Sequence, residues 1–101
     1  MNIMATERGL MVPLILTLPR GLHARPSAKL AQIARKFQSD ILLRGEEGEV
    51  DAKSMLDVLS LSCPARARLV VLAKGPDAKE ALTEIYDYLA GPKDWNGKED
   101  S

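Results

Sequence analysis

Residues 21–37 read GLHARPSAKLAQIARKF and mark the place where a turn gives way to a helix. Apolar residues recur in this stretch at i, i+3, i+4 and i+7, which is the spacing of one face of an α-helix. These residues are Leu30, Ile33, Ala34 and Phe37. Pro26 suits the first turn of a helix, where its missing N–H leaves no hydrogen bond unmade. The stretch therefore predicts a helix from Ala24 onward, with His23, the one histidine of the chain, directly before it.

Four strands are predicted around this helix, and their order decides the fold class. They are expected at residues 10–18, 41–44, 49–52 and 66–74. Pro13 places the first strand at an edge of the sheet or indicates that it starts late, because proline cannot donate a ladder hydrogen bond. The sequence GEEG at residues 45–48 is typical of a hairpin turn between the second and third strands.

Two further helices are predicted from capping signals and apolar stripes. Ser54 begins a short helical run, and Asp57, three positions later, is expected to complete a capping box. Asp77 is expected to cap a final helix together with Glu80, and Gly91 ends that helix. The predicted buried face of the final helix consists of Ala78, Ala81, Leu82, Ile85 and Leu89.

The resulting order, β-α-β-β-α-β-α, predicts an α+β domain in which three helices cover one face of a four-stranded antiparallel sheet. The pattern alone does not separate this arrangement from a ferredoxin-like sandwich, which shares the first six elements. We expect a flexible N-terminal extension at residues 1–9, one domain at residues 10–91 and a polar C-terminal tail at residues 92–101.

Charge and composition argue against several classes of function. The 101 residues carry 14 basic and 14 acidic side chains, which gives no reason to expect binding to nucleic acid or to an anionic membrane. No apolar run has the length of a membrane span and no leader is evident, so a cytoplasmic location is expected. Cys63 has no second cysteine for a disulfide, and no cluster of ligands predicts a metal site or a cofactor.

The position of His23 predicts a site for a phosphoryl group. The first N–H groups of a helix lack acceptors inside the helix, and the helix dipole places partial positive charge beside them. Arg25 adds a permanent cation whose planar fork suits phosphate oxygens. Neutral imidazole is a competent nucleophile near pH 7. The alternative is that His23 is a surface or capping residue without chemistry, whereas a metal site or a serine-type triad lacks the partners it would need.

Two segments carry a resemblance to a known family. GLHARPS at residues 21–27 and AKSMLDVLSL at residues 52–61 resemble the HPr family, the histidine-containing phosphocarriers of the bacterial phosphoenolpyruvate-dependent sugar phosphotransferase system. The resemblance implies an open-faced β-sandwich and phosphorylation of His23 on Nδ1, with Arg25 stabilising the transferred group. It also implies enzyme I as the phosphoryl donor, sugar-specific enzyme IIA components as acceptors, and a monomeric carrier.

Ser54 has a structural and a regulatory interpretation. Serine at the start of a helix is a common N-cap, which stabilises the helix by about 1 kcal/mol. The resemblance implies in addition that Ser54 is phosphorylated by an HPr kinase/phosphorylase, and that the modified protein recruits a transcriptional regulator. A phosphate is electrostatically well placed at a helix N-terminus, so the modification is compatible with the fold.

The second helix holds more apolar residues than one buried face requires, so some are expected to point outward. The resemblance assigns Met55, Leu56 and Leu59 to a docking patch for enzyme I and the IIA proteins. We expect this patch to be rimmed by basic residues, namely Arg25, Arg35 and Lys53. The alternative is that these apolar residues belong to the core.

The chain also departs from the family pattern. Asp57 stands where glycine or lysine is usual, and Ser62 and Arg66 stand where glycines are common, and these departures bear on partner choice and loop geometry. No role is predicted for Cys63 or Trp95. Two further functions remain open, namely an HPr-like carrier of a regulatory or nitrogen-related branch, and a ferredoxin-like binding module without chemistry.

Overall fold

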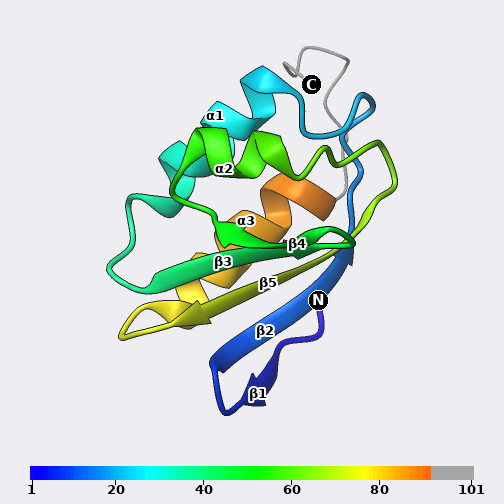
Figure 1. Ribbon diagram of the computed structural model, residues 1–101. Coiled ribbons are helices and arrows are strands. Elements are labelled where there is room, and N and C mark those ends of the chain that lie inside the picture. Colours follow the sequence, from blue (N-terminus) through cyan, green and yellow to red (C-terminus); the bar gives the residue numbers. More distant parts are fainter. Residues whose placement is uncertain (92–101) are drawn as a thin grey trace.

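The computed structural model describes residues 1–91, so the predicted polar tail at residues 92–101, including Trp95, lies outside the described residues. An antiparallel sheet and three helices make up the described part (Figure 1). The strands are β1 (Met4–Thr6), β2 (Gly9–Ile15), β3 (Asp40–Gly45), β4 (Gly48–Asp51) and β5 (Arg68–Lys74). The helices are α1 (Ala24–Ala34), α2 (Met55–Ser60) and α3 (Ala78–Ala90).

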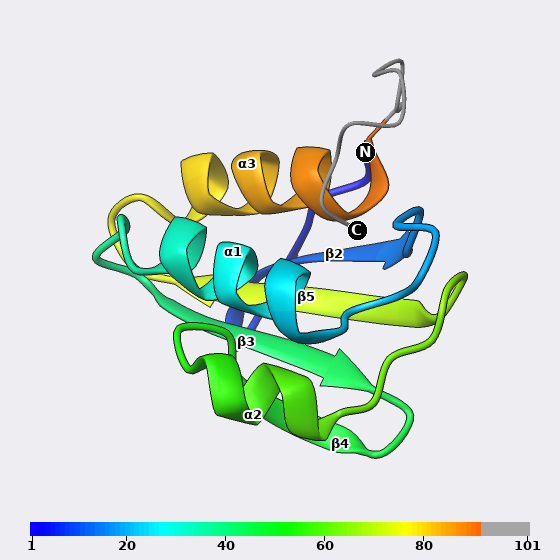
Figure 2. The same ribbon diagram turned by 90° about the horizontal axis from the view of Figure 1, so that it is seen from above.

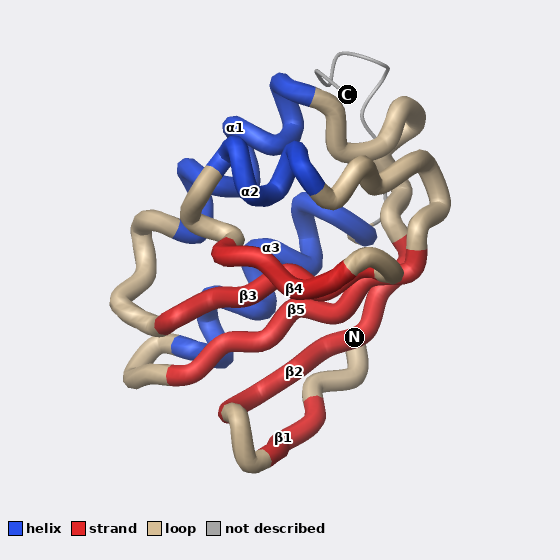
Figure 3. The backbone as a smooth tube through the Cα atoms, in the orientation of Figure 1, coloured by secondary structure: helices blue, strands red, loops and turns tan. Residues whose placement is uncertain are grey.

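The sheet has five strands in the order β1-β2-β5-β3-β4, so the predicted number of four strands is wrong. The added strand, β1, comes from the segment expected to be a flexible extension, and it pairs with the start of β2 (Figure 3). Thr6 stabilises the connecting turn, because its hydroxyl donates to the carbonyl of Gly9 and accepts from the N–H of Arg8. Gly9 has φ +110, and a Cβ at this position would lie 2.5 Å from the carbonyl oxygen of Ala73.

Pro13 does not place β2 at the edge of the sheet, because β1 lies on one side of β2 and β5 on the other. The register explains how proline is tolerated there. β1 pairs with β2 only as far as Met11, whereas Pro13 is opposite Val70 of β5 and lies beyond the last residue that β1 covers. The missing N–H of Pro13 therefore removes no bond between β1 and β2.

All three helices lie on one face of the sheet and leave the other face uncovered, as predicted (Figure 2). α1 and α3 pack side by side over the strands, and α2 lies beside α1 above β4. The predicted apolar faces of α1 and α3 are buried, except that α1 ends before Phe37, which is half-buried. Leu16 and Leu18, which follow β2, also lie in the core at 1% and 0% exposure.

The capping interactions differ from the prediction at two helices. Ser54 caps α2 as expected, because its hydroxyl accepts from the N–H of Asp57 at 3.3 Å. The reciprocal half of the capping box is absent among the described residues, since the N–H of Ser54 donates instead to the carbonyl of Asp51. The predicted box between Asp77 and Glu80 is wrong, because Asp77 occupies the N-cap of α3 but makes no side-chain capping bond.

Asp77 instead connects α3 to the loop between α1 and β3. Its carboxylate accepts from the backbone N–H groups of Gln38 and Ser39, both at 2.9 Å, and from the Ser39 hydroxyl at 2.6 Å. The hydrogen bond from the Ser39 hydroxyl, supported by those from the two amides, holds the pKa of the Asp77 carboxyl below its usual range. The residue therefore stabilises the tertiary fold in its ionised form.

Candidate functional site

His23 is the N-cap residue of α1, with extended backbone angles of φ −78 and ψ −168. Its ring is partly buried and presents its two nitrogens differently. Nε2 is a buried atom without a hydrogen-bond partner in the described part of the chain. Nδ1 is not among the fully buried atoms and makes no hydrogen bond with the described residues, so it is the more accessible of the two nitrogens. A neutral ring that reacts through Nδ1 carries its proton on Nε2.

The first turn of α1 offers unoccupied N–H groups beside the ring. The N–H of Ser27 is the first to bond back, donating to the carbonyl of His23 at 3.0 Å. Pro26 has no N–H, and those of Ala24 and Arg25 donate to no acceptor within residues 1–91. The His23 side chain does not cap them, and the first turn holds no acidic residue. This end of α1 therefore has the properties of an anion-binding site.

The entry into α1 is held by a buried hydroxyl. Ser27 is fully buried at 0% exposure, and its hydroxyl donates to the carbonyl of Leu22 at 3.0 Å. The bond connects the first turn of α1 to the residue before His23. It restricts the chain on both sides of the imidazole, so the ring is presented from a fixed backbone.

The turn before His23 is packed against the loop between α2 and β5. Gly21 has φ +73, and a Cβ added there would lie 2.3 Å from the carbonyl oxygen of Cys63. The N–H of Leu22 donates to that same carbonyl at 2.9 Å. Only glycine combines this left-handed conformation with so close an approach of another backbone. The position of His23 thus depends on a loop some forty residues away in the sequence.

That loop contains two non-glycine residues in the left-handed region, Ser62 with φ 53 and Arg66 with φ 68. Ser62 follows the C-cap of α2, where a residue with positive φ commonly ends a helix. Arg66 lies in a turn closed by the N–H of Ala67, which donates to the carbonyl of Pro64 at 3.1 Å. The two residues noted as departures from the family glycines therefore adopt the glycine-like conformation despite their side chains.

Cys63 contributes its backbone to this arrangement but not a reactive thiol. The residue is 8% exposed. Burial raises the pKa of the Cys63 thiol, and the charge of Glu47 raises it further. A thiol that stays protonated at neutral pH is a poor nucleophile, so Cys63 is not a candidate nucleophile at this end of the molecule.

The predicted docking patch is on the surface of α2. Leu56 is 73% exposed, Met55 and Leu59 are half-buried, and Val58 on the opposite side of the helix is fully buried. Of the expected basic rim, Arg25 is exposed and has no hydrogen bond or ion pair among the described residues. Whether the patch docks a partner stays a prediction.

The other two rim residues are engaged within the protein. The guanidinium of Arg35 donates to the carbonyl of Lys53 at 2.8 Å, and the ammonium of Lys53 donates to the carbonyl of Phe37 at 2.9 Å. These bonds join the end of α1 to the segment that leads into Ser54. Arg35 and Lys53 therefore position α2 against α1, a role that the sequence did not indicate.

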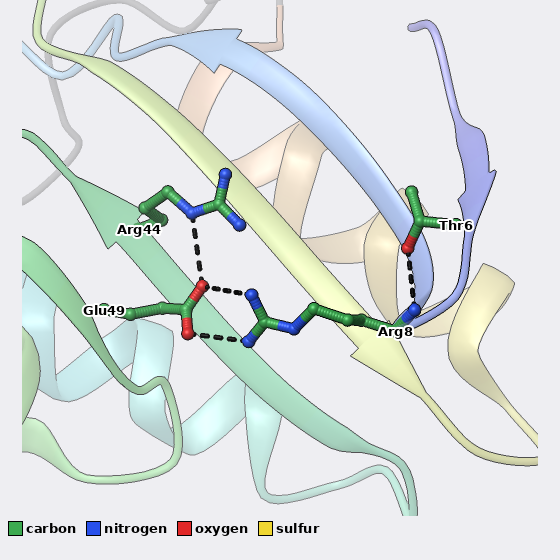
Figure 4. A network of polar contacts seen from close by, with 4 residues as sticks. All are labelled: Thr6, Arg8, Arg44 and Glu49. Atoms are coloured by element: carbon green, nitrogen blue, oxygen red, sulfur yellow. Dashed lines mark hydrogen bonds and ion pairs between the residues drawn. The ribbon is translucent and has the colours of Figure 1, made fainter.

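A second polar network, which the sequence did not indicate either, crosses the uncovered face of the sheet (Figure 4). The guanidinium of Arg8 binds the carboxylate of Glu49 through two contacts, at 2.7 and 3.0 Å, and Arg44 donates to the same carboxylate at 3.2 Å. The hydrogen bond from Arg8 is the main cause that lowers the pKa of the Glu49 carboxyl. The network connects the β1–β2 turn to β4 and contains no residue of the His23 site.

Two classes of site find no support in residues 1–91. No group of three or more histidine, cysteine, aspartate or glutamate side chains is arranged to hold a metal ion there. Within the same range, no helix has the length and apolar character needed to cross a membrane.

Comparison with known proteins assigns a family to this arrangement. The family model described as the PTS HPr component phosphorylation site matches residues 13–91. HPr-like protein Crh from Bacillus subtilis is 36% identical over 72 residues, which cover 71% of this chain and 85% of Crh. The crystal structure of phosphocarrier protein HPr from Bacillus anthracis has a TM-score of 0.76 at 32% identity, covering 78% of this chain and 94% of that one.

A solved structure of Crh bears on the assembly of that relative. The crystal structure of Bacillus subtilis Crh has a TM-score of 0.64 at 37% identity, covers 70% of this chain and 82% of its own, and is described as an intertwined dimer with a swapped domain.

Proposed function

Because the chain belongs to the HPr family of phosphocarrier proteins, we propose that it carries a phosphoryl group on His23 between two protein partners. The donor is enzyme I charged by phosphoenolpyruvate, and the acceptors are sugar-specific enzyme IIA components. The protein would act in the cytoplasm, as a monomer, without a metal or cofactor of its own.

In the proposed transfer, the lone pair of Nδ1 attacks phosphorus while the bond between phosphorus and the donor breaks, and the donor retains that electron pair. The proton of His23 stays on Nε2, so the phosphorylated ring needs no further base. The N–H groups of Ala24 and Arg25, together with the Arg25 guanidinium, face the charge on the phosphoryl oxygens. Onward transfer is the same step in reverse with a different partner.

The observation that carries this proposal is the combination of an accessible Nδ1 with unoccupied amides at one helix end. A structural capping histidine would bond its ring to those amides, and His23 makes no such bond. A reactive nitrogen that is not enclosed also suits a carrier, because the group has to reach two different proteins in turn.

The test is to incubate the protein with enzyme I and phosphoenolpyruvate and to measure its intact mass. We expect the gain of one acid-labile phosphoryl group in the unaltered protein and none in His23→Ala. Cys63→Ser serves as a control, since it removes another potential nucleophile and should still be charged. An unmodified mass, under conditions in which a known carrier is charged, would contradict the proposal.

A regulatory carrier is the second candidate, and the similarity to Crh, named as an HPr-like protein, favours it. This candidate and the sugar-transport role both require charging of His23 and differ in the acceptor. Phosphorylated protein should therefore be mixed with a panel of IIA proteins. Release of the group to any of them supports the transport role, whereas retention with every one supports the regulatory branch.

We further propose that Ser54 is a regulatory phosphorylation site for an HPr kinase/phosphorylase, with a transcriptional regulator binding the modified form. Its support is the position of Ser54 at the start of α2, next to the exposed side chain of Leu56. Mass analysis after incubation with such a kinase, with Ser60→Ala as a positive control and Ser54→Ala as a negative one, tests the assignment.

A further inference from the structure

The arginine side chains of the protein divide into two groups. Those away from the His23 site are engaged, since Arg8 and Arg44 bind Glu49 and Arg35 binds a backbone carbonyl. A second group makes no hydrogen bond or ion pair with the described residues. This group consists of Arg20, Arg25, Arg66 and Arg68. Arginine left without an anion at one end of a protein is available to a partner.

Arg20 and Arg66 come from two loops that lie against each other. A Cβ added to Gly21 would lie only 3.0 Å from the backbone nitrogen of Ala65. Gly21 follows Arg20 and Ala65 precedes Arg66, so the two loops are in contact beside both arginines. The N–H of Arg66 also donates to the carbonyl of Leu16 at 3.1 Å. Figures 1 and 2 both show the two loops side by side at the end where α1 begins.

Arg66 is held in a conformation that glycine would adopt without strain. Its φ is 68, and its side chain is exposed, so packing in the core does not explain why a side chain is retained there. Strained residues cluster at functional sites, where the side chain performs a role that offsets its conformational cost. The strain and the missing partner both suggest that the guanidinium of Arg66 is used.

On the α2 side of His23, the charged side chains are either acidic or already engaged within the protein. Asp57 is exposed there, while Arg35 and Lys53 already bind backbone carbonyls. On the loop side, Arg68 lines the same hollow as two acidic residues, Glu46 and Glu47. The uncompensated positive charge near His23 therefore lies on Arg20, Arg25 and Arg66.

We propose that Arg20 and Arg66 form a second docking element, which binds an acidic surface of the protein that exchanges a phosphoryl group with His23. The inference rests on the proposed function. Two guanidinium groups on adjoining loops suit pairs of carboxylates, and unpaired charge at the rim of an interface accelerates association. The partner thus contacts apolar residues of α2 on one side of His23 and pairs charges with the loops on the other.

The decisive variant is Arg66→Gly, because it removes the charge of the guanidinium and at the same time relieves the backbone strain at the positive φ. We expect its melting temperature to rise by about 4 °C. With phosphorylated enzyme I as the donor at low ionic strength, we expect its KM to rise roughly threefold at unchanged kcat. The difference in KM should shrink as salt is added.

Two matched controls separate the effect of the Arg66 charge from two other effects. One is the relief of backbone strain, and the other is the change in the net charge of the protein. Ser62→Gly relieves the other left-handed residue of the same loop without removing a charge, and it should raise the melting temperature with no change in KM. Arg44→Gln removes the same charge from the uncovered sheet face and should leave KM unchanged. A wild-type KM in the double variant Arg20→Ser, Arg66→Gly at low salt would overturn this inference alone. Failure of the unaltered protein to be charged would overturn the proposed function along with it.

Discussion

The backbone N–H of Leu22 donates to the carbonyl of Cys63 at 2.9 Å, and this bond joins the turn that presents His23 to the loop that follows α2. The bond restrains the backbone on which the partly buried imidazole is carried, and the geometry of a functional site depends on such supports. The two loops should accordingly respond together to mutation.

Gly21→Ala tests this support. The new Cβ would meet the Cys63 carbonyl, and the left-handed backbone would be strained, so we expect a loss of about 2 kcal/mol in the free energy of unfolding. We also expect slower charging at a temperature where the variant is fully folded, because the turn must move away from its support. Denaturant unfolding and the charging rate measure the two effects.

Gly48→Ala is the matched control, because Gly48 also has a positive φ but a Cβ added there would meet no atom within 4 Å. It should lose stability and keep the charging rate of the unaltered protein. Equal charging rates in the two variants would show that His23 does not depend on the loop.

Leu56→Glu tests the docking patch on α2. Leu56 is 73% exposed, so the substitution should change the melting temperature little while opposing an apolar contact with enzyme I. We expect KM for phosphorylated enzyme I to rise about tenfold. Ile15→Glu places the same change on another exposed apolar residue, at 53% exposure on the uncovered sheet face, and should transfer normally. Identical kinetics in both variants would remove α2 from the interface.

Arg25→Ala tests the proposed role of this cation in phosphoryl transfer. Because Arg25 has no other partner among the described residues, its loss should leave the fold intact and slow transfer by about tenfold. Lys29→Ala removes a charge one turn further along α1 and should transfer at the normal rate. Rapid-quench measurement of a single turnover distinguishes the two, and a normal rate in Arg25→Ala would exclude a role in transfer.

Asp77 gives the stability of the fold a defined dependence on pH. Its folded-state pKa lies below the unfolded value near 3.9, so its contribution is complete above that value and is lost as pH falls through the folded pKa. Asp77→Ala should therefore be less stable than the unaltered protein at pH 7, and the gap should close below about pH 4. Urea unfolding between pH 7 and below pH 4 measures this difference in stability, and Asp87→Ala serves as a control that removes an exposed carboxylate. A gap that stays constant with pH would argue against the ionised form as the stabilising one.

Local patterns predicted the elements whose buried face repeats regularly. The apolar stripes of α1 and α3 and the apolar centre of β5 are mostly buried, with Phe37 and Val70 half-buried, and His23 lies at the helix end expected from Pro26. β1 was missed because three residues show no periodicity, and its pairing is set by the turn at Gly9.

Long-range hydrogen bonds account for the other differences between the predictions from the sequence and the structure. Asp77 has the sequence context of a helix cap, yet its partners are 38 and 39 residues away. Arg35 and Lys53 appear in the sequence as surface cations, but the fold brings each within reach of a carbonyl on another segment. Only tertiary structure brings such donors and acceptors together, so no local spacing predicts them.

Pro13 has a consequence for how the molecule behaves in a crowded solution. Beyond Met11 the outer side of β2 has no neighbouring strand within residues 1–91, and an open strand edge is a site where another chain can add a strand and begin an aggregate. A proline there withholds one of the donors that an incoming strand would need. Pro13 therefore disfavours strand addition along this border of the sheet, while Leu56 on α2 presents an apolar side chain to solvent elsewhere on the molecule.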